Sequence, residues 1–128
     1  KAKTILTPHG GEFKKIFTFT DNKIDDALHA SRETNAVVVY KGNDTVIASP
    51  NGDIIINYES SSYLATAGSG DVLAGIIGGI ISQQGDPFKA AKIGCYIHSQ
   101  CALKGGQGLI ASDLIKLIPD VIKKSSII

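Results

Sequence analysis

The segment best suited to chemistry is a glycine-rich turn, Ala67-Gly68-Ser69-Gly70-Asp71, which opens an apolar helical stretch. Glycines let the main chain approach a ligand closely, and the free N–H groups and positive dipole end of the helix favour an anion there. A carboxylate in the first turn could accept the proton of a hydroxyl that attacks a phosphoryl group. An ordinary helix N-terminus has the same GxGD pattern, so both interpretations stay open at this point.

Two further polar segments follow predicted strands. Lys41-Gly42-Asn43-Asp44-Thr45 comes directly after the β-branched run at 36–40, which is typical of a strand buried on both faces. A lysine at the carboxyl end of such a strand could point at nucleotide phosphates, although a solvated lysine in a turn fits equally well. His9 follows a predicted short strand at 4–7 and precedes Gly10-Gly11-Glu12, a pattern of either a ligand loop or a surface turn.

The other histidine and cysteine candidates favour packing over ligand binding. His98 lies mid-helix between Cys95 and Cys101, where a core-facing side chain is the favoured interpretation. The spacing of the two cysteines suits neither a metal site nor a local disulfide, which indicates a reducing, cytoplasmic setting.

Composition excludes several classes of function. The 128 residues carry 13 Lys and Arg against 12 Asp and Glu, with no block of like charge, so the backbone of a nucleic acid is not an expected partner. Because 43% of the residues are hydrophobic and 20% charged, we expect a folded domain. The longest apolar stretch, 73–81, is too short to span a membrane.

The pattern of the chain predicts a strand, a helix, a strand, a hairpin and three consecutive helices, an order typical of the second half of a layered α/β domain. We expect a helix from Asn22, capped by Asp21, and a hairpin of 45–49 and 53–57 around Pro50-Asn51-Gly52. Two helices should follow, one from the Gly68 turn to Gly85 and one from Asp86-Pro87 to about Leu103. The last helix should begin at Ser112-Asp113 and be broken or kinked at Pro119.

Taken together and in order, five segments closely resemble the nucleotide-dependent NAD(P)H-hydrate dehydratases, the carbohydrate-kinase-like domain of the YjeF family. They are LTPHGGEF at 6–13, VVVYKGNDTVI at 37–47, LATAGSGDVLAGI at 64–76, GCYIH at 94–98 and GLIASDL at 108–114. The resemblance spans nearly the whole chain. It implies a ribokinase-like α/β fold with a central, mostly parallel sheet flanked by helices, of which residues 1–128 form a single, partial domain, the C-terminal half.

The same resemblance implies a reaction and a set of roles. The family uses ADP or ATP with Mg²⁺ to repair hydrated NADH or NADPH: the added hydroxyl is phosphorylated, and loss of that phosphate restores the dihydronicotinamide. It implies that Asp71 is the catalytic base and contacts the substrate, and that Gly68, Ser69 and Gly70 form an anion hole. His9 matches a histidine at the substrate; Lys41, Gly42, Asn43, Asp44, Thr45 and Gly70 match the nucleotide-contacting positions. The metal ligands are left open.

The chain also departs from the family pattern. Gly10 stands where a proline is expected, 58–63 differs from the family's glycine-containing loop, and the first half of the domain lies outside the sequence. We therefore expect a homo-oligomer, or association with a chain that supplies the missing half, because exposed sheet edges and apolar faces favour pairing. Two alternatives stay open: a small-molecule kinase acting on a sugar or vitamin-precursor hydroxyl, and a non-catalytic nucleotide-binding remnant.

Overall fold

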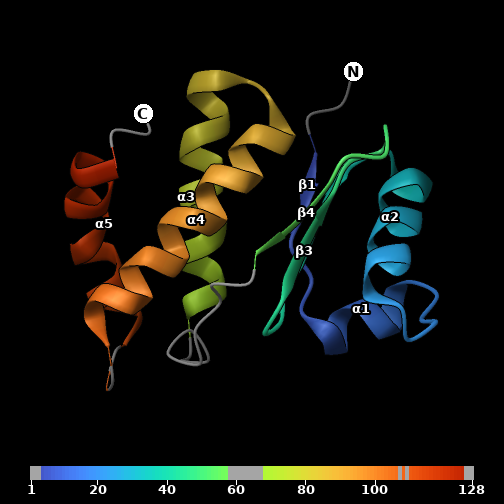
Figure 1. The fold of residues 1–128 in the computed structure, drawn as a ribbon, viewed down its shortest axis with the longest axis horizontal. Coiled ribbons are helices and arrows are strands. Elements are labelled where there is room, and N and C mark those ends of the chain that lie inside the picture. The colour runs from blue at the N-terminus through green and yellow to red at the C-terminus, as the bar shows by residue number, and fades with distance from the viewer. Residues whose placement is uncertain (1–3, 58–67, 107, 109, 126–128) are drawn as a thin grey trace.

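A four-stranded sheet with helices on both of its faces makes up the computed structural model, which describes residues 4–57, 68–106, 108 and 110–125 (Figure 1). The elements in chain order are β1 (Ile5–Leu6), α1 (Gly10–Ile16), α2 (Lys23–Thr34), β2 (Val37–Tyr40), β3 (Thr45–Ala48), β4 (Ile54–Asn57), α3 (Ser69–Gln84), α4 (Pro87–Gly105) and α5 (Ala111–Ser125). The α/β class, the hairpin and the three consecutive C-terminal helices of the sequence analysis are confirmed.

The strands lie in the order β1-β2-β3-β4, and only one of their three pairings is parallel. β1 runs parallel to β2, with Ile5 opposite Val37, whereas β2–β3 and β3–β4 are antiparallel. The expected mostly parallel sheet is therefore wrong for the described strands. The reason is the length of the connections, since a parallel crossover takes roughly a dozen residues or more and only 41–44 join β2 to β3.

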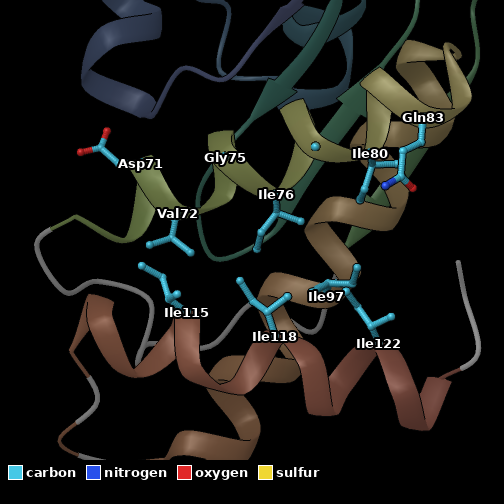
Figure 2. Close-up of a pocket in the computed structure, with 11 residues that line it drawn as sticks. Asp71, Val72, Gly75, Ile76, Ile80, Gln83, Ile97, Ile115, Ile118 and Ile122 are labelled. Carbon is cyan, nitrogen blue, oxygen red and sulfur yellow. The ribbon is translucent and has the colours of Figure 1, made fainter.

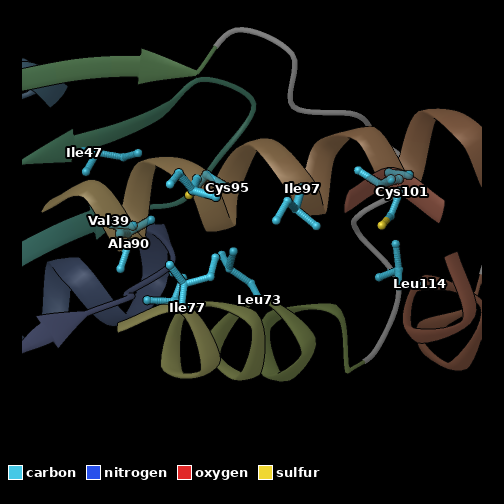
Figure 3. Packing of buried hydrophobic residues seen from close by; sticks show 14 of the residues in the cluster. Val39, Ile47, Leu73, Ile77, Ala90, Cys95, Ile97, Cys101 and Leu114 are labelled. Carbon is cyan, nitrogen blue, oxygen red and sulfur yellow. The ribbon is translucent and has the colours of Figure 1, made fainter. Parts of the chain in front are cut away.

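The two faces of the sheet are covered by different helices. Val38, Tyr40 and Val46 pack with Phe13 and helix α2 on one face. The alternate strand residues pack against α4 and α3 on the other face, where Figure 3 shows Val39 and Ile47 beside Ala90, Cys95 and Ile77. Figure 1 shows α5 on the side of α3 and α4 that faces away from the sheet. This double cover explains why every residue of β2 is buried.

Three local expectations are corrected by the structure. The glycine-rich segment after β1 begins helix α1 at Gly10, because His9 caps it. Asn22, not Asp21, caps α2: the Asn22 side chain accepts from the Asp25 N–H, while Asp21 has a φ of +72°. α5 begins at Ala111 and continues through Pro119 to Ser125 without ending at the proline. Within the described ranges, none of the helices is long and apolar enough to cross a membrane.

Helices α3 and α4 approach each other closely at Gly94. A Cβ atom added to Gly94 would lie 2.5 Å from Ile77 Cγ1 and 3.5 Å from Ile77 Cα. A contact of 2.5 Å is far inside van der Waals distance, so either the Ile77 side chain or the α3 backbone would have to move. The absence of a side chain at Gly94 therefore sets the distance between the two helices.

We expect Gly94→Ala to lower the free energy of unfolding by about 1–3 kcal/mol, the usual cost of overpacking a core. Gly78→Ala is the matched control, because Gly78 is a solvent-exposed helical glycine with no atom within 4 Å of an added Cβ. That control should gain up to about 1 kcal/mol from helix propensity. Urea denaturation of both variants measures the difference; equal effects would contradict the close approach.

Candidate active site

The parallel pairing of β1 and β2 brings their carboxyl ends to one edge of the sheet. The Lys41 N–H, just past β2, donates to the Pro8 carbonyl oxygen, just past β1, at 2.9 Å. The structure thus places the His9 and Lys41 segments side by side, as two neighbouring loops at the end of the sheet.

His9 is fixed in place by a reciprocal capping arrangement with Glu12. Its Nδ1 accepts from the Glu12 N–H at 3.2 Å, and Glu12 Oε1 accepts from the His9 N–H at 3.0 Å. That backbone hydrogen bond holds the pKa of Glu12 below its usual value, and the charges of His9 and Lys41 act in the same direction. The His9 side chain remains 60% exposed, so its ring is positioned and also open to a ligand. Gly10, at the expected proline position, is the first residue of the capped helix.

The predicted anion turn forms the start of α3. Gly68 is the N-cap, with φ +85° and ψ −7°, and Ser69, Gly70 and Asp71 lie in the first turn. A glycine has no side chain with which to cap the first N–H groups, in contrast to His9, Asn22 and Asp86 at the starts of α1, α2 and α4. A Cβ at Gly68 would also meet the Ala111 Cβ at 3.2 Å. Ala67 and the expected loop change at 58–63 lie outside the described residues.

Lys41 brings a positive charge to this turn. Its ammonium Nζ lies only 2.9 Å from where a Cβ of Gly70 would be, so Gly70 leaves the space that the ammonium uses. Two segments predicted separately, the Lys41 loop and the Gly68–Asp71 turn, are therefore adjacent in space. An ammonium beside uncapped N–H groups is an electrostatic environment that favours an anion.

The Lys41–Thr45 loop is itself anchored by a residue that the sequence analysis missed. Lys23 Nζ donates to the Asp44 carbonyl oxygen at 2.6 Å and lies 4.7 Å from the centre of the Tyr40 ring. Thr45 Oγ1 donates to the Gly42 carbonyl oxygen at 3.3 Å and closes the turn. No local motif predicts that Lys23 anchors this loop, because the contact requires the start of α2 to lie beside the end of β2.

Beneath the turn lies His98 of α4, which is 6% exposed. Its Nε2 is 3.0 Å from the Ser69 carbonyl oxygen and 3.1 Å from Ser69 Oγ. The pKa of His98 is lowered to about 4, chiefly by burial; the hydrogen bond with Ser69 acts in the opposite direction, and the charge of Lys41 adds to the lowering. Its predicted packing role is confirmed, but the contact with Ser69 was not foreseen. Cys95 and Cys101 are buried free thiols, as expected.

Asp71 stands at one end of an apolar groove of about 540 Å³ between α3 and α5 (Figure 2). The groove is otherwise lined mainly by isoleucines, namely Ile76, Ile80, Ile97, Ile115, Ile118 and Ile122. The Asp71 carboxylate is exposed and in the same helical turn as Gly70. In the described part of the chain, no hydrogen bond or ion pair joins His9 to this turn. The arrangement can bind an anion and place a carboxylate next to it.

Comparison with known proteins gives the family. A family model described as NAD(P)H-hydrate dehydratase matches residues 1–123. The bifunctional NAD(P)H-hydrate repair enzyme Nnr of Thermosynechococcus vestitus is 44% identical over 108 residues, which are 81% of this chain and 21% of that protein. The ADP/ATP-dependent NAD(P)H-hydrate dehydratase of Bacillus subtilis, co-crystallized with ATP and Mg²⁺, is 33% identical with a TM-score of 0.88, covering 95% of this chain and 48% of that one.

A ribokinase-like superfamily protein of Enterococcus faecalis shares the fold at 23% identity, with a TM-score of 0.82 over 94% of this chain and 44% of that one. The chain spans about half the length of these solved structures and about a fifth of the curated relative. The ribokinase-like architecture expected from the sequence is confirmed. Because the family model matches residues 1–123, the chain belongs to the NAD(P)H-hydrate dehydratase family.

Proposed function

We propose that this chain carries the nucleotide-binding and proton-accepting part of an ADP- or ATP-dependent NAD(P)H-hydrate dehydratase. The observation that carries the proposal is the start of α3, where uncapped N–H groups, the Lys41 ammonium and the Asp71 carboxylate adjoin one another. The names of the relatives supply the substrate class, hydrated NADH or NADPH, and the co-substrate, ADP or ATP.

The proposed reaction has two steps. Asp71 accepts the proton of the added hydroxyl as its oxygen attacks the terminal phosphoryl group of the nucleotide, and the bond from that phosphorus to the bridging oxygen breaks. The Gly68, Ser69 and Gly70 turn and Lys41 stabilise the charge on the transferred group. In the second step the C–O bond of the new phosphate ester breaks and inorganic phosphate leaves with the bonding pair. The neighbouring carbon loses a proton, and the electrons of that C–H bond form the double bond that restores the dihydronicotinamide.

The remaining matched residues take supporting roles in the proposal. Gly42, Asn43, Asp44 and Thr45 form the loop that Lys23 anchors, and we place the nucleotide against it. His9 is held open to solvent by its cap, as a residue that binds the hydrated substrate requires. Lys41 adjoins the Gly68–Asp71 turn, and His9 lies on the loop next to that of Lys41.

The few acidic side chains near the site suit a magnesium ion whose ligands come largely from the nucleotide. Mg²⁺ usually takes one or two carboxylates, with substrate phosphates and water completing its shell. The described residues contain no group of three or more His, Cys, Asp or Glu side chains that could hold a metal ion. The exposed carboxylates of Asp71 and Asp44 are the candidates to reach it. Bound there, the ion would neutralise phosphate charge during transfer.

We expect Gly70→Ala to weaken binding of ADP about tenfold, because the new Cβ displaces the Lys41 ammonium from the anion turn. Folding should be little affected, since the obstructed atom ends a flexible side chain. Isothermal titration with ADP and with inorganic phosphate measures both affinities. Gly78→Ala serves as control on the outer side of α3, and an unchanged affinity in Gly70→Ala would contradict the anion site.

We expect Asp71→Asn to lower the turnover rate by about 10²- to 10⁴-fold, the range for loss of a general base. The assay mixes the protein with hydrated NADH, Mg²⁺ and either ADP or ATP, and follows the return of reduced-nicotinamide absorbance. Asp25→Asn, an exposed carboxylate in the first turn of α2, is the matched control and should keep full activity. Turnover by the Asp71→Asn variant at the unaltered rate would remove Asp71 from the mechanism.

We further propose that residues 1–128 act as half of a domain, in a cytoplasmic setting suited to their free thiols. Among the described strands, β1 has a partner on one side only, and such an edge favours pairing with another strand. We expect the 128-residue chain to associate with a chain that supplies the other half or, when it is produced by itself, to form a homo-oligomer. Light scattering measures the molar mass; a stable, cooperatively unfolding monomer would contradict this expectation.

A further inference from the structure

One buried side chain beneath the site has no role in the reaction proposed above. His98 reaches from α4 to the first residue of α3, and both of its Nε2 contacts are to Ser69. His98 and Ser69 are 6% and 3% exposed, so solvent competes little for these hydrogen bonds. The contact joins the buried core to the turn that we propose binds phosphate.

The chemistry of the two partners fixes the tautomer of the ring. A carbonyl oxygen only accepts, so the 3.0 Å contact with Ser69 O requires a hydrogen on Nε2. The alternative tautomer would set the Nε2 lone pair against the carbonyl lone pairs. Burial of the ring is the main cost of protonating it, and the nearby charge of Lys41, from the loop after β2, adds to that cost. The ring is therefore neutral, with its hydrogen on Nε2.

We propose that His98 is a positioning residue, which holds the Ser69–Gly70 peptide through Nε2–H and so aims the Gly70 N–H at the bound phosphate. This inference rests on the proposed function, because it names what orients the anion hole. In a trans peptide the carbonyl and the N–H of one plane point in opposite directions. A hold on the Ser69 oxygen therefore fixes the direction of the Gly70 N–H.

The neighbouring glycines explain why such a hold is needed. Gly68 and Gly70 flank Ser69, and glycine restricts the backbone least of all residues. A donor that must meet a phosphate in a fixed direction gains from a peptide plane that is already oriented. The accepting Ser69 carbonyl is also polarised by Nε2–H, which strengthens the Gly70 N–H as a donor.

The test compares His98→Gln, His98→Asn and His98→Leu in the purified protein. A glutamine amide nitrogen stands as many bonds from Cβ as Nε2 does, whereas that of asparagine matches Nδ1. We expect Gln to keep ADP affinity within about threefold of the unaltered protein, and Asn and Leu to lose about three- to tenfold. Ile93→Val, a core change in the same helix away from Ser69, should lower stability without changing ADP affinity.

Nitrogen-15 NMR of labelled histidine at neutral pH reads the tautomer directly, and we expect the hydrogen on Nε2. A hydrogen on Nδ1, or an ADP affinity in His98→Leu equal to that of the unaltered protein, would overturn this inference and leave the proposed reaction standing. Weakened ADP binding in the Leu variant together with no turnover of hydrated NADH by the unaltered protein would support the inference and overturn the proposed reaction. Failure of the unaltered protein to bind ADP or phosphate would overturn both.

Discussion

The site depends on one physical constraint: a helix whose first N–H groups have no side-chain cap must satisfy them in another way. α1, α2 and α4 are capped by His9, Asn22 and Asp86, whereas α3 begins at Gly68. Gly68 allows the left-handed conformation and a close approach to the start of α5. The positive charge of Lys41 beside the same turn makes an anion the favoured partner for these N–H groups.

A single parallel strand pair positions the other half of the site. Because β1 and β2 run in the same direction, the loops that follow them leave the sheet at one edge, where the Lys41 N–H bonds the Pro8 carbonyl. The antiparallel hairpin then returns β4 to that edge, so that Asn57 lies opposite Thr45 and donates to Ser99 Oγ of α4 at 3.1 Å. The mixed sheet thus gathers the ends of three strands near the start of α3.

Local signals in the sequence predicted most of the helices and strands, but they could not predict contacts between segments that are distant in the sequence. The Asp86-Pro87 start of α4, the hairpin around Asn51-Gly52 and the Gly68 turn each depend on backbone preferences that neighbouring residues set. The hydrogen bonds of Lys23 with Asp44 and of His98 with Ser69 depend on how whole helices pack. The path of α5 through Pro119 likewise opposes a local preference, since packing of Leu114 and Val121 on the core keeps that helix continuous.

In α4, the same helix face packs against the core and positions a residue of the site. Gly94 and His98 are four residues apart and therefore lie on the same face of the helix, the face that meets α3. Gly94 lets the helices approach until Ile77 occupies the space that a Cβ of residue 94 would take, and His98 one turn later contacts Ser69. A hydrogen bond of 3.0 Å tolerates little added separation, so the same missing side chain that sets the helix distance also keeps His98 within reach of the anion turn. The orientation of the Ser69–Gly70 peptide in the anion turn thus depends on how closely α3 and α4 pack.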